Sequence, residues 1–239
     1  LFATRLGSVL GKVLARSIPV YYDPAYRLPL PAFEGKMGAE PRRADFVAWY
    51  CQAEPLLSRC VLRRPERIQY EDLLRVHTPT YLDAVNHVEE LGRIFASDPT
   101  ELPLDELMLS MRLGCGATLS ATRWVLSKGG AAVNLHGGFH HAARAHGSGL
   151  CVWNDLAVAI AVVRSEGFSG QVVILDLDAH PPDGSADCLG ADEKVFIGSL
   201  SGSDFGTLGP ADVADAHHLV LSEAMEHDEL VEPIEKLGS

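Results

Sequence analysis

The densest group of potential metal ligands in the sequence is ILDLDAHPPDG, which holds Asp176, Asp178, His180 and Asp183 directly after an apolar run. In an extended strand, residues two apart point to the same side, so Asp176, Asp178 and His180 would share one face. Three such groups on a buried strand are costly without a cation. Carboxylate oxygen and imidazole nitrogen together suit zinc or a similar divalent ion. The pattern predicts a divalent-metal site; the alternative is a strand end with solvated acids.

A second group of chemically capable residues is the glycine-flanked pair His140 and His141 in GGFHHA. A neutral imidazole near pH 7 is a good general base. A carboxylate on its far ring nitrogen fixes the tautomer and stabilises the protonated form, and Asp176 and Asp183 are free for that role if Asp178 is a metal ligand. Most histidine pairs in such loops have no catalytic duty, so this pair indicates catalysis only together with the acidic cluster.

Both polar groups follow predicted strands in a chain where strands and helices alternate. Apolar runs bounded by Gly and Pro predict strands at residues 18–22, 60–64, 131–135, 171–180, 195–200 and 218–221. Helical periodicity predicts helices at residues 42–52, 70–76, 79–91, 104–126, 152–164 and 223–236. Small residues such as Gly114 and Gly116 predict that the longest helix packs closely against a sheet.

This alternation predicts an α/β fold with a mostly parallel sheet flanked by helices on both faces. In such sheets, ligands bind at the carboxyl ends of the strands. Both the histidine pair and the acidic cluster lie directly after predicted strands, which is where that rule places a site.

Composition narrows the class of protein. The chain has 239 residues, of which 47% are hydrophobic, so it can bury a substantial core. Its net charge of -12 disfavours a direct nucleic-acid partner and tolerates a cationic substrate. No apolar run reaches the ~18 residues of a membrane span. Five cysteines without a CxxC pair fit a reducing compartment, and a cytoplasmic location is expected.

Four stretches of the chain resemble the histone deacetylase superfamily, including its bacterial acetylpolyamine and acetoin-utilisation branch. They are RVHTPTYLDAV, NLHGGFHHA, GSGLCVWNDLAVAI and VVILDLDAHPPDG, in unbroken order between about residues 19 and 200. The resemblance implies a single arginase/deacetylase-like domain over residues 1–239. It also implies zinc-dependent hydrolysis of an acetyl amide, with an acetylated lysine peptide or polyamine as substrate.

The resemblance also implies a role for each matched catalytic position. His140 and His141 match the family's paired catalytic histidines, with His141 as the general base on a metal-bound water. Asp176 matches the acid that buttresses His140, and Asp183 matches the acid that buttresses His141.

Other matched positions are implied to bind metal or substrate. Asp178 and His180 match two of the family's three zinc ligands. The positions implied to line the acyl pocket are Phe139, Gly149 and Cys151. The positions implied to hold a structural potassium ion, with side chain or backbone, are Asp176, Asp178, His180, Ser199 and Leu200.

Two features depart from the family pattern. The family usually reads DxHxGDG where this chain has DAHPPDG, so Pro181 and Pro182 are expected to re-aim the loop and could displace Asp183 from His141. The AGxD motif of the third zinc ligand and the later glycine-rich loop with the oxyanion-stabilising Tyr do not occur after Leu200.

Three interpretations of the missing motifs remain open. The chain is a C-terminally incomplete piece of an active deacetylase, or an impaired relative that binds a ligand or a protein. Alternatively, it receives its third ligand from another chain or from a loop acid such as Asp204. A sheet that lacks strands would expose an edge, which invites self-association or a partner chain.

Overall fold

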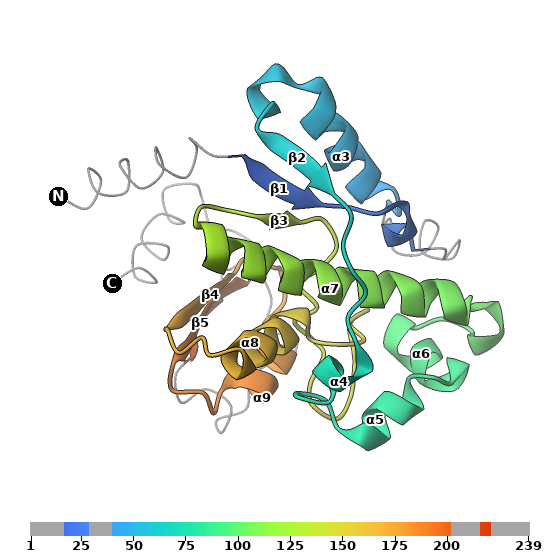
Figure 1. Cartoon of the computed structure of the whole chain (residues 1–239). Helices are drawn as coiled ribbons and strands as arrows, with labels where there is room; N and C mark the ends of the chain where they lie inside the picture. The colour runs from blue at the N-terminus through green and yellow to red at the C-terminus, as the bar shows by residue number, and fades with distance from the viewer. Residues whose placement is uncertain (1–16, 29–39, 202–215, 221–239) are drawn as a thin grey trace.

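The computed structural model describes residues 17–28, 40–201 and 216–220, in which strands and helices alternate (Figure 1). The strands are β1 (Ile18–Tyr21), β2 (Cys60–Arg63), β3 (Val133–Asn134), β4 (Val172–Asp176), β5 (Val195–Ser201) and β6 (Ala216–Val220). The α-helices are α3 (Arg43–Ala53), α4 (Tyr70–Leu73), α5 (Pro79–Ala84), α6 (Val88–Phe95), α7 (Leu104–Lys128), α8 (Asp155–Ser165) and α9 (Asp183–Leu189). Short 3-10 turns are η1 (Pro24–Tyr26), η2 (Pro55–Leu57) and η3 (Pro99–Glu101).

The described strands form two parallel sheets, with the orders β2-β1-β3 and β4-β5-β6. Every strand pair in them is parallel. The predicted parallel α/β architecture is confirmed, although the described strands make two sheets rather than one. Helix α7 runs across the molecule beside the first sheet, and α8 and α9 lie beside β4 and β5 (Figure 1).

The long helix α7 forms the centre of the core. Leu107, Met111 and Cys115 on it are almost completely buried. A Cβ on Gly116 would lie 1.8 Å from the carbonyl oxygen of Glu66. The predicted close packing at the small residues therefore occurs, but at Gly116 the neighbour is the segment before α4 rather than a sheet.

The predicted helix over residues 79–91 is in fact two helices, α5 and α6. Thr78 caps α5 as its sequence position suggests, because its side chain accepts a hydrogen bond from the backbone of Tyr81. The helix has six residues, and just beyond it the side chain of Asn86 donates to the Leu82 carbonyl and replaces a backbone donor. The predicted helix over residues 223–236 lies outside the described residues.

Strand β4 is more exposed than its apolar sequence predicts. Val173, Leu175 and Leu177 expose 71%, 57% and 64% of their surface, and of the residues in β4 itself Ile174 alone is buried. β4 is also the edge of its sheet among the described strands. None of the helices in the described ranges is long and apolar enough to cross a membrane.

Candidate functional site

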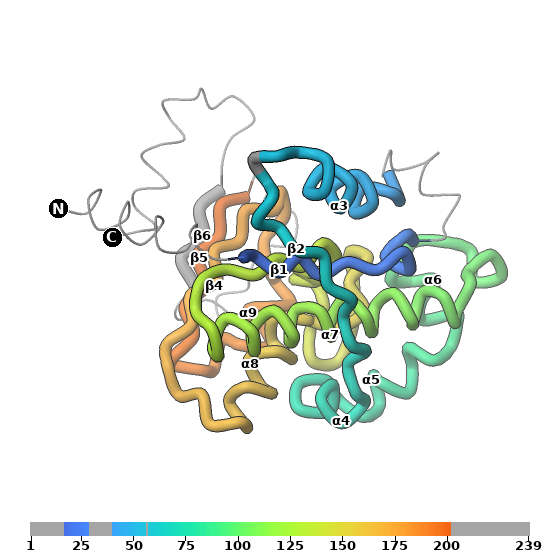
Figure 2. The backbone as a smooth tube through the Cα atoms, turned by 45° about the horizontal axis from the view of Figure 1, so that its top comes forward, coloured from blue at the N-terminus to red at the C-terminus, as the bar shows by residue number. Residues whose placement is uncertain are grey.

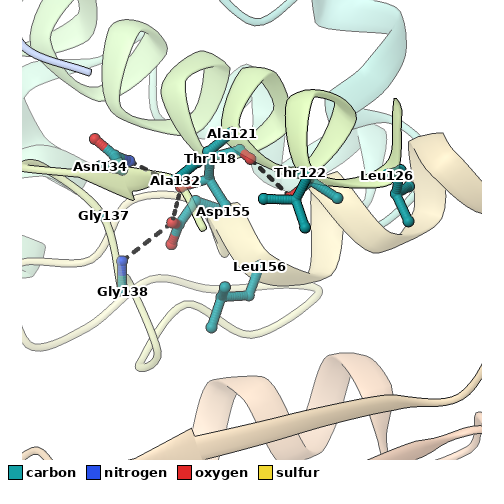
Figure 3. Close-up of a pocket in the computed structure, with 11 residues that line it drawn as sticks. Thr118, Ala121, Thr122, Leu126, Ala132, Asn134, Gly137, Gly138, Asp155 and Leu156 are labelled. Atoms are coloured by element: carbon teal, nitrogen blue, oxygen red, sulfur yellow. Dashed lines mark hydrogen bonds between the residues drawn. The ribbon is translucent and has the colours of Figure 1, made fainter. Parts of the chain in front are cut away.

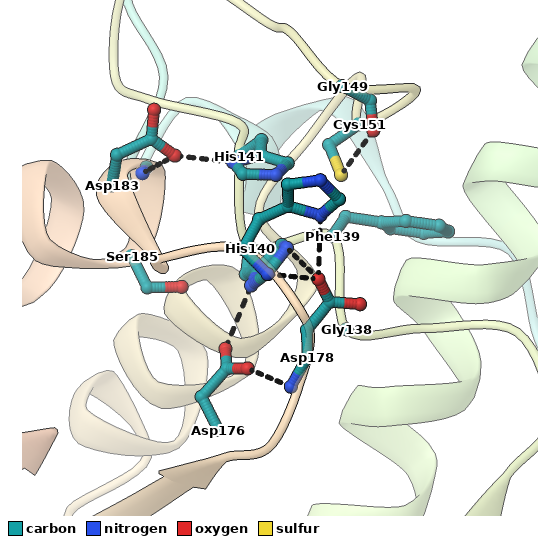
Figure 4. Close-up of polar contacts among 12 residues, drawn as sticks. Gly138, Phe139, His140, His141, Gly149, Cys151, Asp176, Asp178, Asp183 and Ser185 are labelled. Atoms are coloured by element: carbon teal, nitrogen blue, oxygen red, sulfur yellow. Dashed lines mark hydrogen bonds and ion pairs between the residues drawn. The ribbon is translucent and has the colours of Figure 1, made fainter. Parts of the chain in front are cut away.

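Two adjacent histidines, each bonded to its own aspartate, form the centre of the candidate site (Figure 4). The Nδ1 atom of His140 lies 2.9 Å from Asp176 Oδ2, at the end of β4. The Nδ1 atom of His141 lies 2.6 Å from Asp183 Oδ1, at the start of α9. The structure therefore brings these four residues together in the two pairs that the sequence suggests.

Asp178 and His180 lie in a turn beyond β4, not on one face of a strand as predicted. The strand ends at Asp176, because the backbone N–H of Asp178 donates to the Asp176 carboxylate (3.0 Å) and that of His180 donates to the Asp178 carboxylate (2.9 Å). The predicted extended conformation to residue 180 is therefore wrong. The turn still brings the side chains together, with His180 Nδ1 3.0 Å from Asp178 Oδ1.

The histidine pair faces this turn. The ring centroids of His140 and His141 are 4.2 Å apart, and those of His141 and His180 are 5.7 Å apart. Asp178 Oδ1 lies 3.7 Å from His140 Nε2. A carboxylate and three imidazoles thus meet in one small space, of which Asp178 and His180 are the exposed side and His140 the buried side.

Charge interactions set the protonation of two of these groups. Burial alone would lower the pKa of His140, but its hydrogen bond to Asp176 and the negative charges of Asp176, Asp178 and Asp183 outweigh burial and raise it. Burial alone would raise the pKa of Asp178, but hydrogen bonds from the backbone and ring of His180, with the attraction of His140, lower it. The site is built to hold charged groups close together.

The proline pair does not displace Asp183, contrary to the expectation from the sequence. Pro181 and Pro182 are buried, and Pro182 is the N-cap residue of α9. Helix α9 then packs closely on the histidine segment, since a Cβ on Gly184 would lie 2.5 Å from the carbonyl carbon of His141. The sequence signal for this missed helix was an acid after Pro182 in a first helical turn.

Asp155 positions the histidine segment, a role that reading the sequence missed. Its fully buried carboxylate accepts hydrogen bonds from Thr118 Oγ1 (2.6 Å), Gly138 N (3.0 Å) and Phe139 N (2.7 Å). Burial raises the pKa of Asp155, and these donors oppose that effect. The available signal was an Asn-Asp pair at the start of a helix.

The neighbouring Asn154 connects α8 to both sides of the site. Its side chain caps α8 by accepting from Ala157 N (2.9 Å), and its amide donates to Ala142 O (3.2 Å) and Ser185 Oγ (3.1 Å). Its backbone N–H donates to His77 Nε2 (3.1 Å). The residues around the histidine pair are therefore held from α8, α9 and the loop before α5 at once.

Because His77 is buried, we expect the folded chain to lose stability in mild acid. Its Nδ1 donates to Ala143 O (3.0 Å) while Nε2 accepts from Asn154, so the buried ring is neutral. Burial lowers the pKa of His77 from 6.5 to about 4. Because the unfolded chain binds this proton first, the His77 contribution is complete above pH ~6.5 and is lost as the pH falls towards ~4, by roughly 3 kcal/mol in all.

The measurement is the free energy of unfolding against pH for His77→Gln. We expect a shallower loss between pH ~6.5 and ~4 than in the wild type, whereas exposed His87→Gln should keep the wild-type slope. An unchanged slope in His77→Gln would mean that another group sets the acid response.

The three predicted pocket residues do not lie equally close to the histidine pair. A Cβ on Gly149, whose φ is +52°, would lie 2.4 Å from Cδ2 of His141, so a side chain there would collide with the ring. Cys151 Sγ lies 3.3 Å from Gly149 O, and burial raises the pKa of Cys151 to about 12. Phe139 is buried, with its ring edge-on to His136 at 5.2 Å. Figure 4 shows Cys151 beside the histidines and the Phe139 ring directed towards α7.

The donor set fits the two cations that the sequence suggests to different degrees. Asp178 and His180 have the donor chemistry of a zinc site, but within the described ranges no group of three or more His, Cys, Asp or Glu could hold a metal. Catalytic zinc sites usually have three protein ligands, so the described residues supply part of such a site. For a monovalent cation the fit is better: Ser199 pairs in register with Asp176, and its buried Oγ has no hydrogen-bond partner among the described residues.

A cavity of about 500 Å³ lies between α7, β3 and the start of α8 (Figure 3). Thr118, Asn134, Gly138, Asp155 and Leu156 are among its lining residues. It contains none of the predicted catalytic or metal-binding side chains. The candidate site is therefore the surface cluster of Figure 4 and not this cavity.

The fold resembles that of a solved structure. The HDA15 HD domain superimposes with a TM-score of 0.67 at 21% identity, over 87% of this chain and 62% of that chain. At this identity the likeness establishes the fold.

Sequence comparisons identify the family. Histone deacetylase 8 of Xenopus tropicalis is 31% identical over 83% of this chain and 55% of its own length. Histone deacetylase 2 of Arabidopsis thaliana is 26% identical over 82% of this chain and 53% of its own length. The acetoin utilization protein AcuC of Bacillus subtilis is 36% identical over 50% of this chain and 33% of its own length. This chain spans about half the length of the first two relatives. Residues 38–208 match the model of the histone deacetylase domain, and the chain belongs to that family.

Proposed function

We propose that this chain carries the reacting part of a zinc-dependent deacetylase that hydrolyses an acetyl amide. The observation that supports the proposal best is the pair of histidines, each with its own aspartate, facing Asp178 and His180. Amide hydrolysis needs a base for water and a centre for the charge that develops on the carbonyl oxygen. The cluster offers residues for both tasks.

His141 is the proposed general base. Asp183 binds its Nδ1 at 2.6 Å, which leaves Nε2 free to take a proton from water and stabilises the imidazolium that forms. Asp176 holds His140 in the same way. Gly149 leaves room for the His141 ring, and its lack of a side chain is required at that contact.

Asp178 and His180 are the proposed zinc ligands, with a third donor from residues outside the described ranges. Zinc bound there would polarise the acetyl carbonyl and lower the pKa of a bound water. We further propose a potassium ion held, with side chain or backbone, by Asp176, Asp178, His180, Ser199 and Leu200. Its support is the buried Ser199 hydroxyl beside Asp176, which has no hydrogen-bond partner in the part of the chain that the structure describes.

Substrate, domain and location are proposed from the family and from charge. Gly149 and Cys151 beside the histidines, with Phe139, would receive the acyl group. An acetylated lysine peptide or polyamine suits the acidic chain, which has a net charge of -12. We propose one deacetylase domain over residues 1–239 in the cytoplasm, without direct nucleic-acid or membrane binding.

An alternative is a deacetylase-like module that binds a ligand or protein without turnover. The specific observation in its favour is that the described residues supply two zinc ligands rather than three. The test is hydrolysis of an acetyl-lysine peptide and of an acetylpolyamine by the purified chain with added zinc. Turnover that a chelator abolishes supports the enzyme. Ligand binding without turnover supports the module.

We also propose that the chain associates with itself or with a partner chain through the β4 edge. Leu175, which lies on this edge strand, exposes 57% of its surface. Leu175→Lys places a charge on this apolar surface and should shift the chain towards monomer in sedimentation velocity. Leu74→Lys, at an exposed leucine directly after α4, is the matched control. Equal sedimentation of wild type and Leu175→Lys would contradict a role for this edge in self-association.

A further inference from the structure

Two cysteines outside the candidate site face each other between α3 and β2. Cys51 is the last member of the buried stripe of α3, after Ala44 and Ala48. Cys60 begins β2, where alternate side chains are half-buried, so Cys60 and Leu62 share the sheltered side of the strand. α3 packs against β2, and the Cys60 side chain is close enough to raise the pKa of the Cys51 thiol, in addition to the larger effect of burial.

The backbone around the pair is fixed on both sides. Helix α3 ends at Ala53, two residues after Cys51, and Glu54 N donates a hydrogen bond to Tyr50 O (2.9 Å). Cys60 is held in the sheet by its register partner Ile18. Both thiols therefore sit on ordered elements that pack together and are joined by a short connection.

We propose that Cys51 and Cys60 form a reversible disulfide when the protein meets a peroxide. The peroxide transfers an oxygen to the Cys60 sulfur and gives a sulfenic acid and, from hydrogen peroxide, one water. The Cys51 sulfur then displaces the hydroxyl group, and the disulfide forms with a second water. The two electrons lost by the thiols reduce the peroxide.

Exposure decides which sulfur reacts first. Cys60 is half-buried and lies on the edge strand of its sheet, so peroxide can reach it. Cys51 is buried, and burial raises its pKa, an effect to which Cys60 adds. Cys60 is therefore the oxidised thiol and Cys51 the resolving one.

The other three cysteines are differently placed. Cys115, Cys151 and Cys188 are buried, and each directs its sulfur to a backbone carbonyl, of Trp153, Gly149 and Ala142 respectively. Figures 1 and 2 show α3 and β2 apart from α8 and α9, so the proposed link lies away from the histidine cluster. The disulfide would tie the outer helix to the edge strand without touching the candidate site.

The experiment treats the purified full chain with hydrogen peroxide, alkylates the remaining thiols and maps peptides by mass spectrometry. We expect a Cys51–Cys60 linked peptide pair that dithiothreitol removes, with the other three cysteines alkylated. The melting temperature should rise by roughly 5 °C on oxidation, because a short loop is closed.

Cys60→Ser and Cys60→Ala should both lose the linked pair and the rise in melting temperature. Two outcomes would overturn the proposal. One is a different cysteine pairing in the wild type. The other is Cys60 oxidised to a sulfinic or sulfonic acid while Cys51 remains an alkylatable thiol.

Discussion

Replacing His141 with Ala is expected to lower kcat/KM for an acetyl-lysine peptide by about 10²–10⁴-fold. The reason is that the His141 ring, bonded to Asp183, is the proposed acceptor of the water proton. Among the described residues, no other group stands at the position of the His141 ring beside His180. The measurement is hydrolysis of the peptide at saturating zinc, with the melting temperature recorded for each variant. Because the ring is half-buried rather than central to the core, the fold should persist.

His146→Ala is the matched control for this change. His146 belongs to the same loop and is exposed, so its removal should leave kcat/KM near the wild-type value. If His141→Ala retained full activity, as His146→Ala is expected to, His141 would not be the base. If His141→Ala lost activity because the protein unfolded, the result would point to a structural role of His141. Asp183→Asn, a change of similar volume, would then separate the structural role from the catalytic one.

Replacing Asp155 with Ala is expected to lower the free energy of unfolding by about 3–5 kcal/mol. Its carboxylate accepts three hydrogen bonds in a fully buried position, and truncation leaves Thr118 and the amides of Gly138 and Phe139 without an acceptor. Two of these donors lie in the turn that leads into His140. Activity should therefore fall as well, even though Asp155 touches no reacting atom.

Asp105→Ala provides the control. Asp105 and Asp155 are both acids in the first turn of a helix, of α7 and α8 respectively, but Asp105 is exposed. Both variants lose the favourable interaction with the helix dipole, which amounts to about 0.3–1 kcal/mol. Urea unfolding should show that the Asp155→Ala loss is several times larger. Equal losses would show that the hydrogen bonds to the histidine segment contribute little.

The residues of the candidate site could be predicted because they follow strands and occur in a distinctive order. The two histidine–aspartate pairs form as the resemblance implied, although the two prolines were expected to displace Asp183 from His141. What the sequence did not predict was the path of the chain. Strand periodicity continues through residues 176–180, but the carboxylates of Asp176 and Asp178 capture backbone amides and end the strand.

Long-range effects explain the other differences. The apolar run of β4 is typical of a strand buried on both faces, yet Val173 and Leu175 are exposed because they share the face of β4 opposite the buried Ile174, and that face is open. The role of Asp155 depends on a contact with residues 17 positions earlier, which periodicity does not reveal. Helix α9 was missed because seven residues are too few for a helical pattern to stand out.

The most direct test of the proposed site is the zinc content of the purified chain, measured by inductively coupled plasma mass spectrometry. We expect about one zinc ion per chain in the wild type, a loss of most of it in Asp178→Ala and His180→Ala, and retention in His141→Ala. Wild-type chain without stoichiometric zinc after equilibration with the metal, or His180→Ala with the same zinc content as the wild type, would contradict Asp178 and His180 as zinc ligands.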